Sequence, residues 1–337
     1  MLLEFDADQR LWQETVRDAV TKQCPATLIR SIAEAGVDPT PLWQTYLDAG
    51  WTELIEPDNT VELAIVIEEL GRATDPTPFL ATMSQYAPLV GDRFDPQQAG
   101  TAIYSGVTAA RAAEGWLLEG TARFVLDGDR AESLAVVTAA GVFVVAPAEH
   151  GDAIRVRRDA IFDPVLHVAD LSFTGVRVAD TDRLVVDTEK AHHVALTGMA
   201  MTMVGACQRI LDLVLEHVKS RHQFGVPIGS FQAVQHKAAD MHVAIERARA
   251  LSYFAALTIA TDDPRRRLAA AMAKASAGEC QSLVFRHGLQ LFGAMGFTWE
   301  NDLQFALKRA KAGELMLGGA AEHRAVVVSE YERVRGA

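Results

Sequence analysis

The sequence predicts an α+β protein in which a helical zone, a β-sheet zone and a second helical zone follow one another along the chain. Three changes of pattern support this order. Apolar residues recur at helical spacing from Asp6 to about Ala87. They come in short runs between Thr101 and about Val186, and in long uninterrupted stretches after Ala191.

The N-terminal zone is predicted to be helical because its apolar residues repeat every three or four positions. Such spacing places them on one face of a helix, which can then pack against a core. The first group is Leu11, Trp12, Val16, Ala19 and Val20, and the second is Leu63, Ile65, Val66, Ile67 and Leu70.

The central zone is predicted to form an antiparallel sheet, because its apolar runs are short and separated by glycine and aspartate, which favour turns. The runs are Trp116–Leu118, Phe124–Leu126, Leu134–Thr138, Val142–Ala146 and Val168–Val178.

The C-terminal zone is predicted to contain three long helices, at about Val194–Arg221, Phe231–Ala260 and Leu268–Phe292. Gly225-Val226-Pro227 and Asp262-Asp263-Pro264 separate them. At about 1.5 Å per residue, helices of this kind are roughly 35 to 45 Å long, which is the scale of a helical bundle.

Composition narrows the possible functions. The 337 residues carry a net charge of −12, which argues against a nucleic-acid surface. We find no stretch of about 18 uncharged apolar residues, so we predict no membrane span. The three cysteines fit neither a disulfide framework nor a metal knuckle, which favours a reducing cytoplasm. His236 and Asp240 have i,i+4 spacing but lack a third ligand, so we predict no metal site.

Two clusters rich in glycine follow predicted helices, at residues 221–232 (RHQFGVPIGSFQ) and 290–297 (QLFGAMGF). The Arg221 guanidinium can give two parallel hydrogen bonds to a phosphate, and glycine lets backbone amides approach an anion closely. The alternative interpretation is that both are ordinary helix ends, where glycine and basic residues are common. The sequence contains none of the common Gly-rich nucleotide loops, zinc-protease or serine-hydrolase motifs.

Both clusters resemble motifs of the acyl-CoA dehydrogenase family, R-x-x-F-G-x-P-[IL]-x-x-F-Q and Q-x-[FL]-G-G-x-G-[FY]. Further matches to this family in the same order are residues 8–17, 66–72 and 115–120. The resemblance implies a helical N-terminal domain (residues 1–98), a central antiparallel β domain (99–188) and a C-terminal four-helix bundle (189–337).

The resemblance also implies a chemistry: a glutamate removes the α-proton of an acyl-CoA thioester while FAD accepts a hydride from Cβ. The family holds FAD partly with a β-domain loop (T-E-P-x-x-G-S-D) and strand (W-I-[ST]) of one subunit. A neighbouring subunit covers the pyrophosphate and adenosine with the two clusters. The implied cofactor residues of this chain are Arg221, Gln223, Phe224, Gln232, Gln290, Phe292, Gly293, Ala294 and Gly296. Among these residues only Ala294 differs from the family motifs, which have a second glycine at that position.

The residues that would bind a flavin within the same subunit are largely missing. Only the short segment Ile103–Glu114 stands where the family has its flavin loop. Phe124 keeps an aromatic ring, but Leu126 replaces the hydroxyl of the W-I-[ST] strand. We expect the loss of two or three hydrogen bonds to weaken flavin binding by about one to three decades.

The catalytic glutamate is also missing. Leu317 stands at its usual position, and Ala195 stands at the alternative position 26 residues before Arg221. Glu246 and Glu314 are the nearest carboxylates that could substitute for it. Both have an alternative interpretation as solvated carboxylates on a helix face.

The sequence therefore predicts a flavin-poor, non-catalytic subunit whose clusters complete an FAD site shared with a longer partner subunit. It resembles the short subunits of actinobacterial α2β2 acyl-CoA dehydrogenases that oxidise steroid side-chain CoA thioesters in β-oxidation. Electron-transfer flavoprotein is the acceptor that this resemblance implies. One alternative is a self-sufficient homotetramer that uses Glu246 or Glu314 as its base. The other is a flavin-free interaction protein with the same fold.

Overall fold

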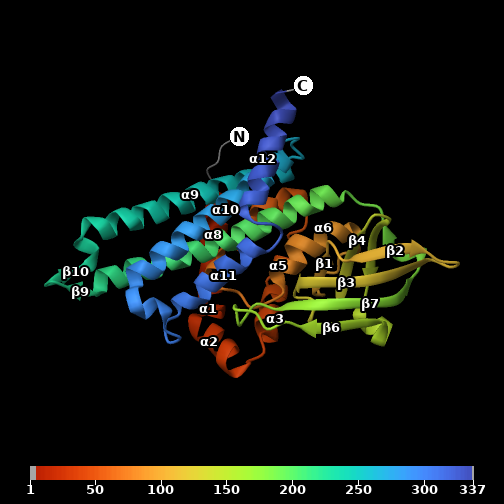
Figure 1. The fold of residues 1–337 in the computed structure, drawn as a ribbon, viewed down its shortest axis with the longest axis horizontal. Coiled ribbons are helices and arrows are strands. Elements are labelled where there is room, and N and C mark those ends of the chain that lie inside the picture. The colour runs from red at the N-terminus through yellow and green to blue at the C-terminus, as the bar shows by residue number, and fades with distance from the viewer. Residues whose placement is uncertain (1–4, 336–337) are drawn as a thin grey trace. The chain divides into compact units, whose positions relative to one another are not determined.

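The computed structural model describes residues 5–335 and confirms the predicted α+β class (Figure 1). The chain forms two compact units. The first contains the described residues up to Val37, Glu56–Asp75 and those from Leu196 onward, and the second contains Asp38–Ile55 and Pro76–Ala195. The three domain boundaries expected from the family stay a prediction.

The N-terminal part of the first unit consists of α1 (Ala7–Gln23), α2 (Ala26–Ala35) and α4 (Thr60–Ala73). Helix α1 begins with a capping box, in which Asp6 and Gln9 each bond the other's backbone N–H. It buries Val16 and Val20, as its apolar spacing predicts.

Helices form most of the rest of this unit, and the three longest of them run beside one another in Figure 1. The helices are α8 (Thr188–Ser220), α9 (Gln232–Ala260), α10 (Arg266–Phe292), α11 (Leu303–Leu315) and α12 (Ala320–Arg335). The first residues of α8, up to Ala195, belong to the second unit. Backbone contact brings α4 against α8: a Cβ on Gly205 would lie 2.0 Å from the Glu68 carbonyl oxygen. Glycine is therefore required at this crossing.

Helix α8 is long and apolar enough, by length and composition, to cross a membrane. Within the structure, 83% of its most apolar window is buried. That degree of burial is typical of a core helix in a bundle.

The second unit contains two four-stranded sheets. The first has the order β1-β4-β5-β8 and the second the order β2-β3-β7-β6. Strands β1 and β4 pair in parallel, and the other pairs of these sheets are antiparallel. The strands are β1 (Gly100–Ile103), β2 (Val107–Arg111), β3 (Trp116–Leu126), β4 (Ser133–Thr138), β5 (Gly141–Val145), β6 (Ile154–Arg158), β7 (Val168–Val178) and β8 (Arg183–Leu184).

Short helices flank these sheets within the second unit, and buried aromatic and branched residues fill its core. The helices are α3 (Thr40–Asp48), α5 (Phe79–Ala81), a π-helical turn (Thr82–Tyr86), α6 (Ala87–Val90) and α7 (Pro147–His150). The core includes Leu118, Leu134, Phe143 and Phe173, each at most 1% exposed.

Two features of the β zone differ from the sequence prediction. The runs Trp116–Leu118 and Phe124–Leu126 belong to one strand, β3, whose pairing with β7 is irregular at Leu118/Gly120 and Ala122/Val125. The segment Ile103–Glu114 is not only a loop, because it contains the end of β1 and all of β2. Strand β2 was missed because four of its five residues are not buried and carry no apolar alternation.

Candidate functional site

The first predicted cluster forms a small hairpin between α8 and α9. The Arg221 N–H bonds the His217 carbonyl at 2.8 Å, and the Arg221 carbonyl accepts the Ile228 N–H at 2.8 Å. Between them, β9 (His222–Gln223) pairs with β10 (Val226–Pro227). Phe224 and Gly225 form the tight turn, both with positive φ (54° and 80°). Two positive φ values are typical of a two-residue hairpin turn that matches the twist of its strands.

The second cluster ends α10. Gly293 has a φ of 61° and closes the helix end, with its N–H bonded to the carbonyl oxygens of Gln290 and Leu289. Gly296 is buried, and a Cβ there would lie 3.0 Å from the Phe292 Cβ. Ala294 is not in the positive-φ region, so replacing the family's glycine by alanine costs no backbone strain at this position.

The structure brings the end of α8, which leads into the first cluster, next to the second cluster. The His217 ring stacks on the Phe292 ring, with centroids 4.4 Å apart and planes 14° from parallel. Burial lowers the pKa of His217, and the nearby Arg221 charge lowers it further. Both clusters therefore lie at one end of the bundle, where β9 and β10 are labelled in Figure 1.

The polar side chains of these clusters are available for a ligand from outside the chain. Within residues 5–335, the Arg221 guanidinium has no hydrogen bond or ion pair. Gln232 and Gln290 are exposed, while the Gln223 side-chain amide donates to the neighbouring His222 carbonyl at 2.8 Å. The Phe224 ring is 92% exposed. An exposed cation, amides and open glycine turns fit the phosphates of a nucleotide cofactor.

The two β3 positions predicted to contact a flavin, Phe124 and Leu126, offer fewer polar groups than the glycine-rich clusters do. Leu126 is buried (4% exposed), and its carbonyl already accepts the Thr101 hydroxyl at 2.6 Å. Phe124 projects from an irregular part of β3 with a φ of 55° and is 66% exposed. The aromatic ring is present, but a hydroxyl at position 126 is not.

Tyr104, next to β1, is a polar residue of the second unit that the sequence reasoning missed. Its hydroxyl is buried without a hydrogen-bond partner, and burial raises its pKa. Its ring lies edge-on to His192, with centroids 5.2 Å apart. A tyrosine directly after a buried strand residue, Ile103, is a signal that could have been used.

The two positions predicted to correspond to the family's base hold apolar side chains. Leu317 lies in the turn between α11 and α12 with a φ of 55°, and Ala195 is fully buried on α8. Glu246 forms an ion pair with Arg249 on the surface of α9. Glu314 accepts the Ala320 N–H at 3.0 Å through Oε1, while its Oε2 is buried without a partner.

Lys274 on α10 is a second residue that the sequence reasoning missed. Its side chain is fully buried, and its ammonium group donates to the Gly318 carbonyl at 2.6 Å. Burial lowers its pKa from the ordinary 10.5 to about 8, against the opposing effect of Glu314 and Glu322. A single lysine inside the alanine-rich stretch 269–277 was the available signal. Lys274 thus fixes the turn that contains Leu317 and Gly318.

Replacing Lys274 by methionine should remove a pH dependence of stability. Between pH 8 and 10.5 the folded chain has released the Lys274 proton, whereas the unfolded chain still holds it. The contribution of Lys274 to the free energy of unfolding therefore rises with pH across that window, by up to about 3 kcal/mol. Unfolding midpoints of both proteins should be measured from pH 7.5 to 10.5. The midpoint of the wild type minus that of Lys274→Met should increase with pH. Exposed Lys219→Met is the control, and parallel curves for Lys274→Met would contradict the prediction.

Comparisons with known proteins agree with this structure. A family model described as the C-terminal domain of acyl-CoA dehydrogenase matches residues 190–330. The chain is 31% identical over 330 residues to the acyl-CoA dehydrogenase IpdE2 of Mycobacterium tuberculosis, covering 94% of each chain. The predicted resemblance is therefore confirmed at the level of the family.

Solved structures show the same fold. The ChsE4-ChsE5 complex from Mycobacterium tuberculosis matches with a TM-score of 0.87 and 21% identity, over 98% of this chain and 99% of that chain. The Tcur3481-Tcur3483 steroid ACAD G363A variant matches with a TM-score of 0.83 and 22% identity, over 98% and 99% of the two chains. At such identities these structures establish the fold alone.

Proposed function

This chain belongs to the acyl-CoA dehydrogenase family, whose members oxidise CH–CH bonds, and from that premise we propose that it completes an FAD site in a partner subunit. It would act as the non-catalytic chain of a hetero-oligomer. The observation that carries this proposal is the exposed Arg221 guanidinium, which has no partner within the described chain and lies beside open glycine turns.

In this arrangement, Arg221 would pair with the cofactor pyrophosphate through two parallel N–H donors. Gln223, Gln232 and Gln290 would add neutral hydrogen bonds, and the exposed Phe224 ring would cover an apolar part of the cofactor. The turns at Gly225 and Gly293 allow close approach, because a Cβ at either would meet no atom within 4 Å. When bound, FAD supplies the hydride acceptor.

The remaining cofactor-binding groups and the base would come from the partner subunit. Leu126 offers no hydroxyl, and Leu317 and Ala195 offer no proton acceptor. This chain has the residues that would contact a partner's cofactor but lacks the residues of a complete flavin site of its own. That combination fits one working site per pair of chains. The same reasoning disfavours a flavin-free interaction protein, since assembly alone does not require an exposed phosphate-binding arginine.

We infer a bulky acyl-CoA as the substrate class of the complex, of the steroid side-chain type. The similar structures include a two-protein complex and a protein described as a steroid ACAD, which supports a second subunit and a steroid-type substrate. Electron-transfer flavoprotein would accept the electrons, and the complex would work in the cytoplasm as an α2β2 oligomer.

A self-sufficient enzyme that uses Glu314 is the second candidate. Its Oε2 is buried without a hydrogen-bond partner, in the turn region of Leu317. Such an enzyme would be a yellow, active homotetramer when expressed alone. Glu246 is a weaker base candidate, because Arg249 already pairs with it.

Expressed alone, the chain should therefore contain little or no FAD and should not oxidise acyl-CoA substrates. The reason is the missing hydroxyl at Leu126 together with the missing carboxylates at Leu317 and Ala195. Absorbance of the purified chain in the flavin band, after incubation with FAD and gel filtration, checks this expectation. A stoichiometric flavin on the isolated chain would favour the self-sufficient enzyme instead.

A further inference from the structure

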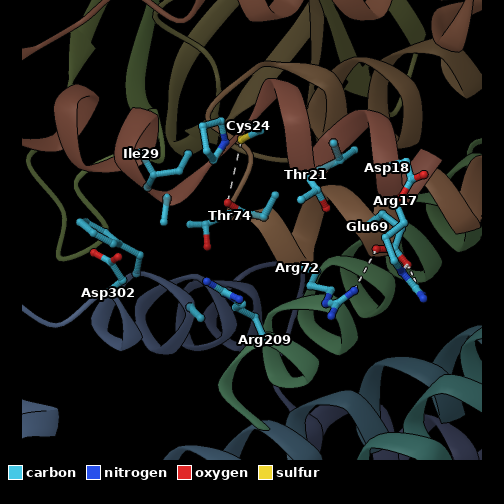
Figure 2. Close-up of a pocket in the computed structure, with 16 residues that line it drawn as sticks. Arg17, Asp18, Thr21, Cys24, Ile29, Glu69, Arg72, Thr74, Arg209 and Asp302 are labelled. Carbon is cyan, nitrogen blue, oxygen red and sulfur yellow. Dashed lines mark hydrogen bonds and ion pairs between the residues drawn. The ribbon is translucent and has the colours of Figure 1, made fainter. Parts of the chain in front are cut away.

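The first unit contains a cavity of about 440 Å³ that lies outside the cofactor-binding clusters. Five helices surround it, namely α1, α2, α4, α8 and α11, and Figure 2 shows ten of its lining residues by name. We call it the α1–α2 cavity. Its lining residues include Arg17, Asp18, Ile29, Glu69, Arg72, Thr74, Arg209, Asp302 and Phe305. Small-molecule sites commonly have volumes of about 300 to 1,000 Å³, so it could enclose a small ligand.

Most charges that line the cavity are paired with one another or with neighbours. Glu69 accepts Arg17 at 2.7 Å and lies 3.7 Å from Arg72. Arg72 also binds Asp212 at 2.7 Å, and Asp302 is paired with Arg30. These four groups are therefore held by protein partners and present little net charge to a ligand.

Arg209 is different. Its guanidinium lines the cavity from α8 and is half-buried (Figure 2). No hydrogen bond or ion pair joins it to any residue between 5 and 335. Withdrawing a permanent charge from water without a partner is costly, so such a group is a candidate for binding an anion.

Apolar walls stand beside this charge. Val20, Ile29 and Phe305 are each at most 3% exposed in the chain as a whole and contribute to the lining. Thr74, at the end of α4, also lines the cavity and has a φ of 61°, a backbone conformation that is strained for threonine. A ligand that satisfies both kinds of surface has an anionic head and an apolar body.

We propose that the α1–α2 cavity binds a small organic carboxylate, with its carboxylate on Arg209 and its apolar part against Ile29 and Phe305. A guanidinium binds a carboxylate with two parallel hydrogen bonds. A monoanion fits better than inorganic phosphate, since the Asp18 carboxylate also lines the cavity and would repel a dianion more strongly. Phosphate would also leave the apolar walls without contacts. This site is separate from the shared cofactor site and does not depend on it.

Calorimetric titration of the full chain with hexanoate tests the proposal, and hexanol and inorganic phosphate serve as comparison ligands. Hexanoate should bind with saturation, more tightly than either of the others. Arg209→Gln, which removes the charge at similar length, should weaken hexanoate binding at least about ten-fold. Arg209→Lys should retain part of the affinity, and Arg286→Gln, an exposed arginine of α10 that does not line the cavity, should retain all of it.

Three results would overturn the proposal. Hexanol binding as tightly as hexanoate would mean an apolar cavity without an anion site. If phosphate bound and hexanoate did not, the proposed contribution of the apolar walls to ligand binding would be wrong. Unchanged hexanoate affinity in a folded Arg209→Gln variant, with folding checked by circular dichroism, would place the ligand elsewhere. Hexanoate affinity is measured on this chain without FAD, so its failure is distinguishable from failure of the shared-flavin proposal.

Discussion

Replacing Arg221 by alanine should weaken FAD binding to the mixed oligomer about ten- to a hundred-fold. The expectation rests on a charge-assisted, two-donor interaction with the pyrophosphate, which contributes about 1.5 to 3 kcal/mol. The oligomer should remain assembled, because Arg221 is exposed and its guanidinium has no hydrogen bond or ion pair among the described residues. Titration of FAD into the purified apo-complex measures the change.

Two variants separate this role from a general loss of charge. Lys219→Ala removes an exposed cation two residues earlier, at the same end of α8, and should leave FAD affinity nearly unchanged. Arg221→Lys keeps the charge without the forked geometry and should give an intermediate loss. Equal FAD affinities in wild type and Arg221→Ala would mean that Arg221 only ends a helix and does not contact the cofactor. The shared-site proposal would then be wrong.

Replacing Arg249 by methionine should destabilise the first unit by about 3 to 5 kcal/mol. Glu68 on α4 is buried (4% exposed) and accepts hydrogen bonds from Arg249 at 2.7 Å and Tyr253 at 2.8 Å. Arg249 also donates to Gln208 on α8 at 2.9 Å, so it joins three helices. Its removal would leave a buried carboxylate without its ion-pair partner, which is the costly case.

Thermal unfolding of the chain should therefore shift down by about 5 to 10 °C in Arg249→Met. The matched control is Glu246→Gln, which removes the exposed partner of the same arginine and should cost less than about 1 kcal/mol. In the double variant Glu68→Gln/Arg249→Met, part of the loss should be recovered, because the buried carboxylate that lost its partner is no longer present. A loss in Arg249→Met no larger than in Glu246→Gln would mean that solvent already screens Glu68.

The sequence predicted the long elements well, because their patterns are strong. The ends of α9 and α10 at Ala260 and Phe292 lie where the Asp-Asp-Pro breaker and Gly293 place them. The start of α8 was placed too late, since residues 188–193 are polar apart from Ala191 and carry no apolar period of their own. Strands β1, β2 and β6 were missed because they are short and, in β2 and β6, mostly exposed on the sheet surface.

The residues of the candidate site were predicted from local sequence motifs. Such motifs identify the residues of each cluster but do not predict how the clusters pack against each other. The two glycine-rich clusters were identified separately, but the His217 and Phe292 stack that joins them depends on how α8 and α10 pack. The same limit applies to Arg209 and Lys274. Whether an arginine in an apolar helix lines a cavity, or a lysine among alanines donates to a distant carbonyl, depends on contacts far apart in sequence.

The number of flavins in the complex tests the central claim most directly. Co-expression with a longer acyl-CoA dehydrogenase chain as the candidate partner subunit, followed by native mass spectrometry and flavin absorbance of the purified complex, gives FAD per chain. The shared-site account predicts one FAD for each pair of this chain and its longer partner, and loss of that FAD in Arg221→Ala. One FAD for every chain, retained when Arg221 is replaced, would contradict it.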